Sequence, residues 1–483
     1  MVSGSGPNTA FRRHLGVIAA VALGIRLAFV LVVQSRIVDL RGDAGWYHFQ
    51  ARLVADGRGF LNPVFFYDSG TAIPGAQHPP GFVLFLAALD LLGIDTPQGQ
   101  RVVMTLVGTM SVVVIGLLGR RLGGPRVGLI AAGLAAVYPN MWINDGMLLT
   151  ETVFILATSV ALLFTYRYFV SVARTDLLAI SAALTAAMLV RPESALMFVV
   201  LVLPLVLTRR TLAGRERLLQ LVMAAILPVV ALTPWLAYNL SRFDEPVLLS
   251  TGLGQTLLAG NCDATYSGEK IGFWEFECIP PAPPLSEDNP DLSGMDPVYR
   301  DQALEYMSEH RSDLPRVVTA RVLRLWGLFR PEQSVGLDGM VEGRAGGAPG
   351  DGLRIAREAM WAYFVLLPAA IAGAVLLRRR RVQILALFAQ ALIATVVAAA
   401  TFGLTRYRAG VEVSIVLLAA VAAGWAWSRL TDIVDEESVR GPLRPPDRDR
   451  TGADPTAEDR TQQERSDRDR PGGDRSEVGA DAP

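Results

Sequence analysis

Residues 99–143 of the chain read GQRVVMTLVGTMSVVVIGLLGRRLGGPRVGLIAAGLAAVYPNMWI. This stretch contains two apolar runs, 99–119 and 126–143, and each approaches the roughly 20 residues that a helix needs to cross a bilayer. The connection between them is short and basic, with Arg120, Arg121 and Arg126. Two apolar runs joined in this way are typical of membrane helices that meet at a cytoplasmic loop.

The whole chain has the composition of a membrane protein. Of its 483 residues, 51% are hydrophobic and only 19% are charged, whereas a soluble protein of this length carries more charge. The formal net charge of -1 gives no reason to expect a polyanionic partner such as nucleic acid. Lipid admits only helices or closed barrels, and the apolar runs are long. We therefore predict an all-α polytopic membrane protein.

Ten apolar runs predict about ten transmembrane helices. The runs at 176–190 and 193–208 are short for a hydrocarbon core of about 30 Å, so these helices are tilted or end at a water-filled cavity. The ten runs are 15–34, 99–119, 126–143, 147–166, 176–190, 193–208, 218–238, 358–377, 382–402 and 409–428.

Loop arginines predict the orientation of these helices in the membrane. Every second connection is basic, so we place the basic connections and both termini in the cytoplasm. The same alternation puts 35–98 and 239–357 outside. It also predicts that the apolar segment 79–93 is a helix at the outer interface, with an eleventh span as the alternative. The arginines that define the pattern are Arg12, Arg13, Arg120, Arg121, Arg126, Arg167, Arg174, Arg209, Arg210, Arg215, Arg217 and Arg378 to Arg381.

Four parts of the chain follow from this topology. Residues 1–238 form an N-terminal transmembrane module that includes the first outer loop, 35–98. Residues 239–357 form a small extracytoplasmic domain, which we expect to be α/β or mixed, and 358–429 supply the last membrane helices. The tail 430–483 is rich in Asp, Arg, Pro and Gly, and we predict that it is a disordered cytoplasmic segment.

The first outer loop contains a predicted helix. In DAGWYHFQARLVADGRGF, the apolar residues Trp46, Phe49, Leu53 and Val54 recur at helical spacing. This pattern favours an amphipathic helix beside the membrane.

The second outer region carries the two cysteines of the chain. Cys262 and Cys278 lie sixteen residues apart, outside the cytoplasm, where oxidation is permitted. We predict a disulfide that stabilises the outer domain, and two free thiols are the alternative.

Ionisable residues gather at the predicted outer ends of the spans. Placing a charged side chain at membrane depth costs free energy, so such residues usually have a binding partner or a function. A group with both signs on one side predicts a polar cavity that opens outward, although any single arginine could instead reach the lipid headgroups. Arg26 differs because it lies inside the first span. The others are Asp43, His78, Arg101, Glu151, Arg191, Glu193, Arg406 and Arg408.

Several motifs occur in a characteristic order along the chain. They are GDAGWYHFQARLVADGRGF, QHPPGFVLFLAAL, YPNMWINDGMLLTETVF, LVRPESALMF, PWLAYNLSRFDEPVLLS and TRYRAGVEVSIVLLAA. Together they resemble bacterial membrane glycosyltransferases of the protein O-mannosyltransferase-like superfamily (glycosyltransferase family 39), which have the GT-C fold. The resemblance covers about residues 15–430, and it depends on the order of the motifs because each one alone is weak.

The resemblance implies a glycosyltransferase on the outer face of the plasma membrane. Such an enzyme moves a sugar from a polyprenyl-phosphate donor to a glycan, lipid or protein acceptor. Asp43 in RGDAGWY matches the family acid of the first outer loop, and Glu151 in LLTETVF matches the second family acid. Ala44 stands where many members have a further acid, which weakens a protein-mannosyl assignment but not the class.

The resemblance also implies how the donor is bound. Arg101 matches an arginine associated with the donor phosphate, while Arg191 and Arg406 match less specific motifs. The residue types suit the reaction, because a carboxylate can accept the acceptor's proton and guanidinium groups bind phosphate. We place Tyr47 and His78 in the acceptor or sugar pocket. No cofactor is certain, although Asp43 and Glu151 could share a divalent metal ion.

The main alternative is a transporter or flippase for a lipid or solute. Such a protein also has many helices and buried charges. Transporters, however, usually show internal repeats and helices broken at the midplane. Here the charges lie at one membrane face, and no repeat is visible in the sequence. A scaffold without activity is the third interpretation.

The predicted topology can be tested by cysteine labelling. In a chain whose two cysteines are replaced by serine, Lys270→Cys should react with a membrane-impermeant maleimide in intact cells. Arg210→Cys should react only after permeabilisation. Protection of residue 270 in intact cells would overturn the orientation.

Overall fold

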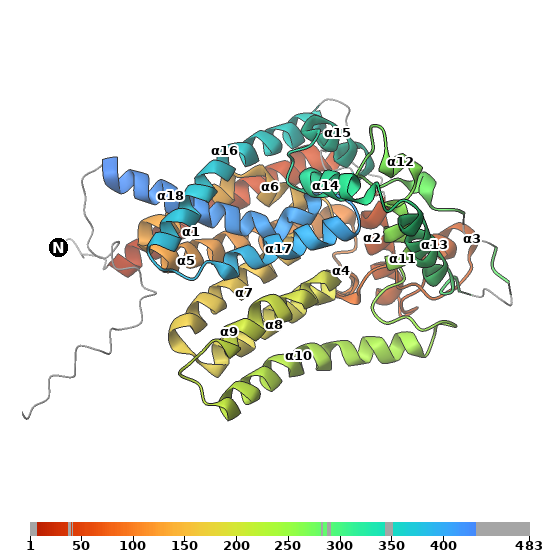
Figure 1. Cartoon of the computed structure of the whole chain (residues 1–483), viewed down its shortest axis with the longest axis horizontal. Helices are drawn as coiled ribbons and strands as arrows, with labels where there is room; N and C mark the ends of the chain where they lie inside the picture. Colours follow the sequence, from red (N-terminus) through yellow and green to blue (C-terminus); the bar gives the residue numbers. More distant parts are fainter. Residues whose placement is uncertain are drawn as a thin grey trace, which may run out of the picture. The chain divides into compact units, whose positions relative to one another are not determined.

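The computed structural model describes residues 7–36, 40, 42–281, 284–286, 291–342 and 351–430. These residues form helices and loops, without a strand among them (Figure 1). The all-α prediction is therefore confirmed. The expected disordered tail lies outside the described residues from 431 onward.

Six helical stretches among the described residues are long and apolar enough to cross a membrane. Three shorter apolar helices are Pro80–Leu91, Pro192–Leu207 and Leu385–Ala400, and α8 (Arg174–Val190) packs between α7 and α10. The chain is therefore a multi-pass membrane protein, while the count of ten spans stays a prediction. The six are Asn8–Val33, which contains α1 (Pro7–Ala28), then α5 (Pro97–Val137), α7 (Glu151–Ser171), α10 (Gly214–Leu240), Arg354–Arg379 within α16 (Asp351–Arg379), and Thr405–Arg429, which contains most of α18 (Ala409–Leu430).

A glycine pair divides α5 into two helices. Gly123 and Gly124 depart from helical geometry, and Gly124 has φ 86°, ψ -179°, a conformation that favours glycine. Pro125 follows and begins the second helix, where its missing N–H is tolerated. The two apolar runs of this stretch are thus two helices that meet at the predicted basic connection.

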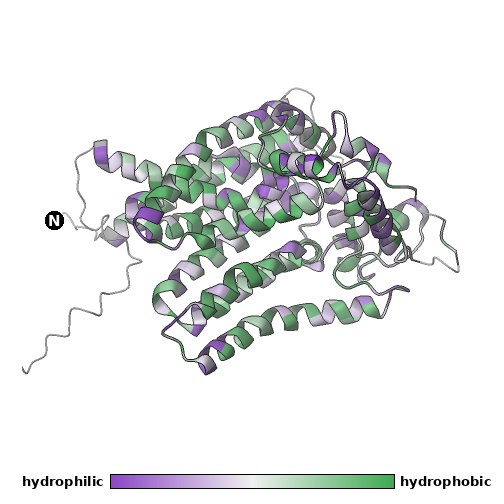
Figure 2. Ribbon diagram, in the orientation of Figure 1, coloured by the Kyte–Doolittle hydropathy of each residue, from purple (hydrophilic) through white to green (hydrophobic). Residues whose placement is uncertain are grey.

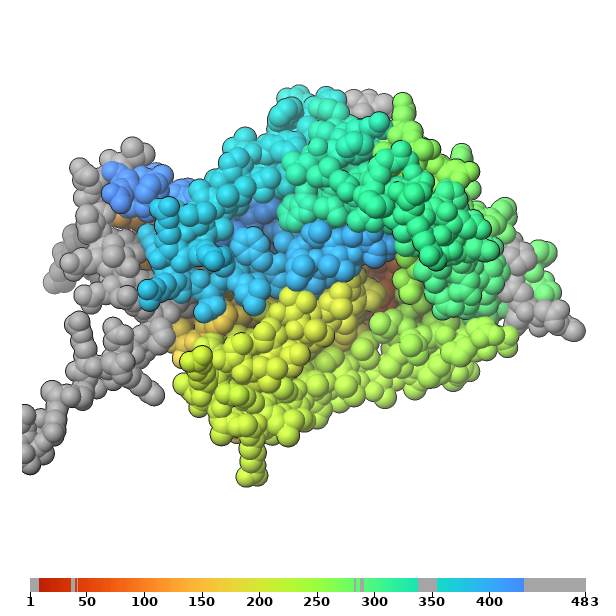
Figure 3. All heavy atoms as spheres, viewed as in Figure 1, coloured from red at the N-terminus to blue at the C-terminus, as the bar shows by residue number. Residues whose placement is uncertain are grey.

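The long helices consist mostly of apolar residues (Figure 2), and many of these residues are exposed. The clearest case is α10, which forms a ridge along one side of the other helices (Figure 3). Its Val222, Ile226, Val229 and Val230 are each more than half exposed. In water such a surface would be unfavourable, so its exposure agrees with contact to lipid.

One buried ion pair crosses the helical core. Arg26 of α1 and Asp145 of the turn Ile143–Gly146 are fully buried, and Arg26 Nε lies 2.8 Å from Asp145 Oδ2. Thr152 donates to the other carboxylate oxygen at 2.9 Å. Gly108 of α5 faces this carboxylate, and a Cβ atom there would overlap it. The pair explains why Arg26 is tolerated inside a span, because a buried charge needs a partner.

The first outer loop forms α2 (Gly42–Ala55), α3 (Pro63–Ser69) and α4 (Pro80–Leu91). The helix predicted from Trp46 to Val54 is confirmed, but its predicted apolar face is only partly correct. Phe49 is 40% exposed, whereas Tyr47 is buried. The reason is that α2 packs against α4, where the Tyr47 ring meets Phe82 edge-on at 5.0 Å.

The length of α4 favours the predicted helix at the outer interface over an eleventh span. Its twelve residues give a helix of about 18 Å, too short for a hydrocarbon core of about 30 Å. Pro80 begins the helix, and Gly81 lets it approach the backbone of Leu189 at the end of α8. The HPPG motif therefore starts α4 and permits its close packing.

The described residues of the predicted outer region, 239–357, form five α-helices, which lie at the same end of the long helices as α2 and α3 (Figure 1). Its described residues contain no strand, so the expected α/β or mixed character is wrong. Its loops are held by two fully buried arginines: Arg321 donates to Gly260 O at 2.6 Å, and Arg324 to Ile271 O at 2.6 Å. The helices are α11 (Leu253–Ala259), α12 (Asp263–Tyr266), α13 (Met295–Glu309), α14 (Leu314–Leu325) and α15 (Pro331–Glu342).

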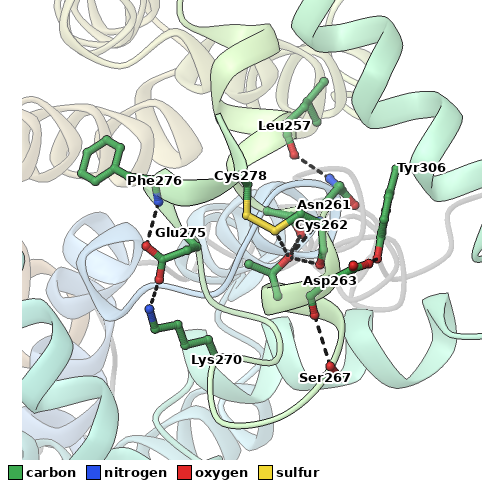
Figure 4. Close-up of a disulfide and its surroundings, with 12 residues drawn as sticks. Leu257, Asn261, Cys262, Asp263, Ser267, Lys270, Glu275, Phe276, Cys278 and Tyr306 are labelled. Atoms are coloured by element: carbon green, nitrogen blue, oxygen red, sulfur yellow. Dashed lines mark hydrogen bonds and ion pairs between the residues drawn. A yellow bond between two sulfur atoms is a disulfide. The ribbon is translucent and has the colours of Figure 1, made fainter. Parts of the chain in front are cut away.

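Cys262 and Cys278 form a disulfide in this region, with Cα atoms 5.8 Å apart. Figure 4 shows that it joins the residue before α12 to the short turn Phe276–Cys278. Tyr306 of α13 donates to Asp263 at 2.6 Å beside it. The bond thus closes the loop from 262 to 278.

Loss of this disulfide should lower stability without changing chemistry. A closed loop of sixteen residues is worth roughly 3 kcal/mol, so reduction should lower the thermal unfolding midpoint measured by intrinsic fluorescence. The double serine variant should show the lower midpoint and no further response to reductant. An unchanged midpoint in the reduced wild-type protein would contradict a stabilising role.

Candidate functional site

The first outer loop is held in place from two sides. Gln50 of α2 donates to Leu61 O at 2.9 Å and to Gly75 O at 3.1 Å. Arg242, just after α10, donates to Phe60 O and to Gly75 O. These bonds fix the segment that leads to His78 and α4.

Four segments that are far apart in the sequence bring ionisable residues together. Asp43 lies in the first turn of α2, Glu151 begins α7, Arg191 follows α8, and Arg406 lies in the turn Thr405–Arg408 before α18. Arg406 joins the two acids: Nε donates to Glu151 Oε1 at 2.5 Å, and its terminal NH2 group donates to Asp43 Oδ2 at 2.8 Å. The structure thus brings together two predicted acids and two predicted arginines.

Arg191 completes this group, which we call the acid–arginine cluster (Asp43, Glu151, Arg191, Glu193 and Arg406). Arg191 donates to Glu151 Oε1 at 3.0 Å and to Glu193 Oε1 at 2.8 Å. Glu193, from the RPE motif, is not among the predicted site residues. Its proximity could have been inferred, because it lies two residues from Arg191 at the same helix end.

Exposure increases from one end of the cluster to the other. The Glu151 side chain is 0% exposed, that of Arg406 11% and that of Asp43 37%. A buried carboxylate is tolerated only when it is paired, and Glu151 has both guanidinium groups. Asp43 is therefore the acid that a molecule from outside can reach.

His78 lies beside Asp43, and Tyr47 lies beside His78, while their predicted place in an acceptor or sugar pocket stays a prediction. His78 Nε2 is 3.5 Å from Asp43 Oδ1, and the Tyr47 ring stacks on His78 with centroids 4.5 Å apart. Burial alone would raise the pKa of Asp43, but Arg406 and His78 outweigh it and hold that pKa well below its usual range. Burial and the Asp43 carboxylate raise the pKa of Tyr47, so the phenol stays a hydrogen-bond donor.

Arg101 is placed differently from the other predicted arginines. It lies in α5 and is buried, and its NH1 group donates to Gln34 O at 3.1 Å. This contact fastens α5 to the end of the first span. Its predicted role at the donor phosphate stays a prediction.

A second buried network supports the turn that carries Arg406. Arg408 donates to Glu412 Oε1 at 2.6 Å, and Tyr138 donates to Glu412 Oε2 at 2.8 Å. Arg408 also donates to Leu325 O at the end of α14. Glu412 and Tyr138 are not among the predicted site residues, although the i, i+4 spacing of Arg408 and Glu412 is a recognisable helical pattern.

The cluster does not fit a divalent metal ion shared by Asp43 and Glu151. The guanidinium of Arg406 already binds both carboxylates, so a metal ion between them would have to displace this cation. Within the described residues, no three His, Cys, Asp or Glu side chains are grouped to hold a metal. We therefore derive no step through a metal at this position.

Residues 77–238 match the family model described as dolichyl-phosphate-mannose-protein mannosyltransferase. The match covers about a third of the chain and includes Glu151 and Arg191, but not Asp43 or Arg406. None of the curated proteins matches the chain. The match confirms the family resemblance of this segment.

The chain is also similar to solved structures of membrane glycosyltransferases. The oligosaccharyltransferase AglB from Archaeoglobus fulgidus, in complex with an inhibitory peptide and a dolichol-phosphate, is 14% identical, with a TM-score of 0.50 over 89% of this chain and 52% of that chain. The same protein tethered to an acceptor peptide is also 14% identical, with a TM-score of 0.50 over 89% of this chain and 51% of that chain. ArnT from Cupriavidus metallidurans, bound to undecaprenyl phosphate, is 17% identical, with a TM-score of 0.38 over 87% of this chain and 79% of that chain.

The similarity to AglB shows the fold. The chain spans about half the length of the archaeal protein, so the activity of that protein is not transferred here. With the family match, this similarity confirms the predicted resemblance to membrane glycosyltransferases of the GT-C fold.

The role of Arg406 as the cation between two acids can be tested with Mn²⁺. Wild-type protein should show no tight binding in electron paramagnetic resonance titrations, because the guanidinium already neutralises Asp43 and Glu151. Arg406→Gln should bind Mn²⁺ more tightly, while Arg300→Gln, at an exposed arginine of α13, should behave as wild type. Tight binding by the wild-type protein that Asp43→Asn abolishes would show that the site is a metal site.

Proposed function

We propose that this chain, a multi-pass membrane protein with the GT-C fold, is a glycosyltransferase that moves a sugar from a polyprenyl-phosphate donor to an acceptor. We place the reaction on the extracytoplasmic face of a bacterial plasma membrane. The observation that carries the proposal is the acid–arginine cluster, in which Arg406 bridges a buried acid and a reachable acid. Two cations and an accessible carboxylate are what displacement of a phosphate requires.

The arginines suit the leaving group. When the bond between the sugar and the phosphate breaks, polyprenyl phosphate gains negative charge, and positioned cations stabilise that charge. Arg191 and Arg406 present planar guanidinium groups, which bind phosphate oxygens in pairs. Arg101 is a further candidate, at the start of α5. The lipid tail would stay in the bilayer while the sugar lies at the cluster.

Asp43 suits the acceptor. In the transfer, the acceptor oxygen forms a bond to the anomeric carbon, the bond to phosphate breaks, and the hydroxyl proton passes to a base. Asp43 is partly exposed, and its Oδ1 faces His78 at 3.5 Å. Its lowered pKa keeps it ionised, so that it is ready to accept this proton late in the reaction, when the hydroxyl has become acidic.

The test is sugar transfer by purified protein in proteoliposomes, with a panel of polyprenyl-phosphate sugars as donors. Asp43→Asn should lower the rate by about 10²-fold or more, because loss of a general base typically costs that much. Asp68→Asn, an exposed acid of the same loop, is the matched control. Between pH 5 and 7 the wild-type rate should show no acid limb from Asp43, because its lowered pKa keeps it ionised.

Full transfer by Asp43→Asn, with normal membrane insertion, would remove Asp43 from the reaction. A protein that moves the labelled lipid across the vesicle membrane without cleaving it would be a flippase. The same vesicles therefore distinguish the two functions.

A further inference from the structure

A small pocket lies between the first outer loop and the outer region. Its volume is about 230 Å³. One wall comes from α2 and the segment 74–77, and the opposite wall comes from α11, α13 and the loop around Phe243. The backbone bond from Thr251 N to Ala76 O, at 2.8 Å, holds the two walls together.

The pocket begins next to the acid–arginine cluster. Trp46, which lines it, follows Asp43 by three residues, about one turn of α2. The Trp46 ring meets His78 edge-on, with centroids 6.3 Å apart. Gln77, in the same wall as Trp46, directly precedes His78. A molecule in the pocket therefore reaches toward the exposed side of Asp43.

The lining combines flat apolar rings with amides and acids. Trp46, Phe243 and Tyr299 supply the rings, and Asp291 and Asp296 supply negative charge. The residues that line the pocket include no Arg, Lys or His, in contrast to the cluster beside it. An anionic ligand such as a phosphate would meet like charge here.

Two amides in the pocket have unused hydrogen-bonding groups. Gln77 Nε2 donates to Gln255 Oε1 at 2.8 Å, and this bond links the two walls. Within the described part of the chain, the Gln77 oxygen and the Gln255 nitrogen make no other hydrogen bond. The pair therefore offers one acceptor and one donor, side by side.

These features match the chemistry of a neutral sugar. A sugar ring has an apolar face of C–H groups, which packs on aromatic rings, and an edge of hydroxyls, each both donor and acceptor. The volume is below the range of about 300–1,000 Å³ typical of pockets for drug-sized ligands, so it suits a single ring with the rest of the ligand outside. An extended peptide needs a row of hydrogen-bonding groups, whereas the pocket offers the single Gln77–Gln255 pair.

We propose that this pocket binds the acceptor and that the acceptor is an uncharged saccharide. The inference rests on the proposed function and names its acceptor class. The sugar ring packs on Trp46, its hydroxyls bond to the Gln77–Gln255 pair, and the hydroxyl to be modified points toward Asp43.

Binding can be measured without a donor. Saturation-transfer NMR on the full-length protein in nanodiscs would use mannobiose, galactobiose and arabinobiose as neutral probes, with a glucuronate-containing disaccharide and a Ser/Thr-rich peptide for comparison. At least one neutral disaccharide should bind, and Trp46→Ala and Gln255→Leu should each weaken its binding tenfold or more. Trp361→Ala and Gln302→Leu, which change exposed residues of α16 and α13, should leave it unchanged.

Three results would overturn this inference: no neutral disaccharide binds, binding is insensitive to Trp46 and Gln255, or the peptide binds in a Trp46-dependent manner and points to a protein acceptor. The outcome is separable from that of the proposed function. If Asp43→Asn loses transfer but no saccharide binds, only the acceptor assignment fails. If Trp46-dependent saccharide binding is found but Asp43→Asn retains transfer, the pocket stands and the role of Asp43 fails.

Discussion

The bridge that Arg406 makes between Asp43 and Glu151 is the contact on which the site depends. Glu151 is fully buried, and a buried carboxylate without its partner is destabilising by about 3–5 kcal/mol. The end of α8 and the turn Thr405–Arg408 bring Arg191 and Arg406 to the start of α7, where both guanidinium groups bind this carboxylate. Asp43, bound to the same guanidinium, then fixes the first turn of α2 against the membrane helices.

The sequence predicts the helices and the candidate residues of the site better than the ion pairs that join these residues. Apolar runs are local signals, and they lead to the correct all-α architecture, while the orientation predicted from the loop arginines stays a prediction. Topology also places Asp43, Glu151, Arg191 and Arg406 on one side of the membrane. Arg406 is 255 residues from Glu151 and 363 from Asp43, so its bridging role depends on packing that no local pattern contains.

The outer region shows a second limit of local patterns. Its length predicts a small domain, but no local pattern predicts that the guanidinium groups of Arg321 and Arg324 bind its loop carbonyls. In the same way, α2 is correctly predicted as a helix, but its buried face depends on α4. Tyr47 is buried and Phe49 exposed because Phe82 meets one and not the other.

The turn Thr405–Arg408 connects the two sides of the site. Through Arg406 it contacts Asp43 and Glu151, and through Arg408 it contacts Leu325 at the end of α14. Arg321 of the same helix α14 binds both Ala399 O, before this turn, and Gly260 O, after α11. Since α11 carries Gln255, contacts of buried arginines join the wall of the pocket that we propose for the acceptor to the position of Arg406. A rearrangement of α14 would therefore move both, which ties the geometry of the acceptor side to that of the donor side.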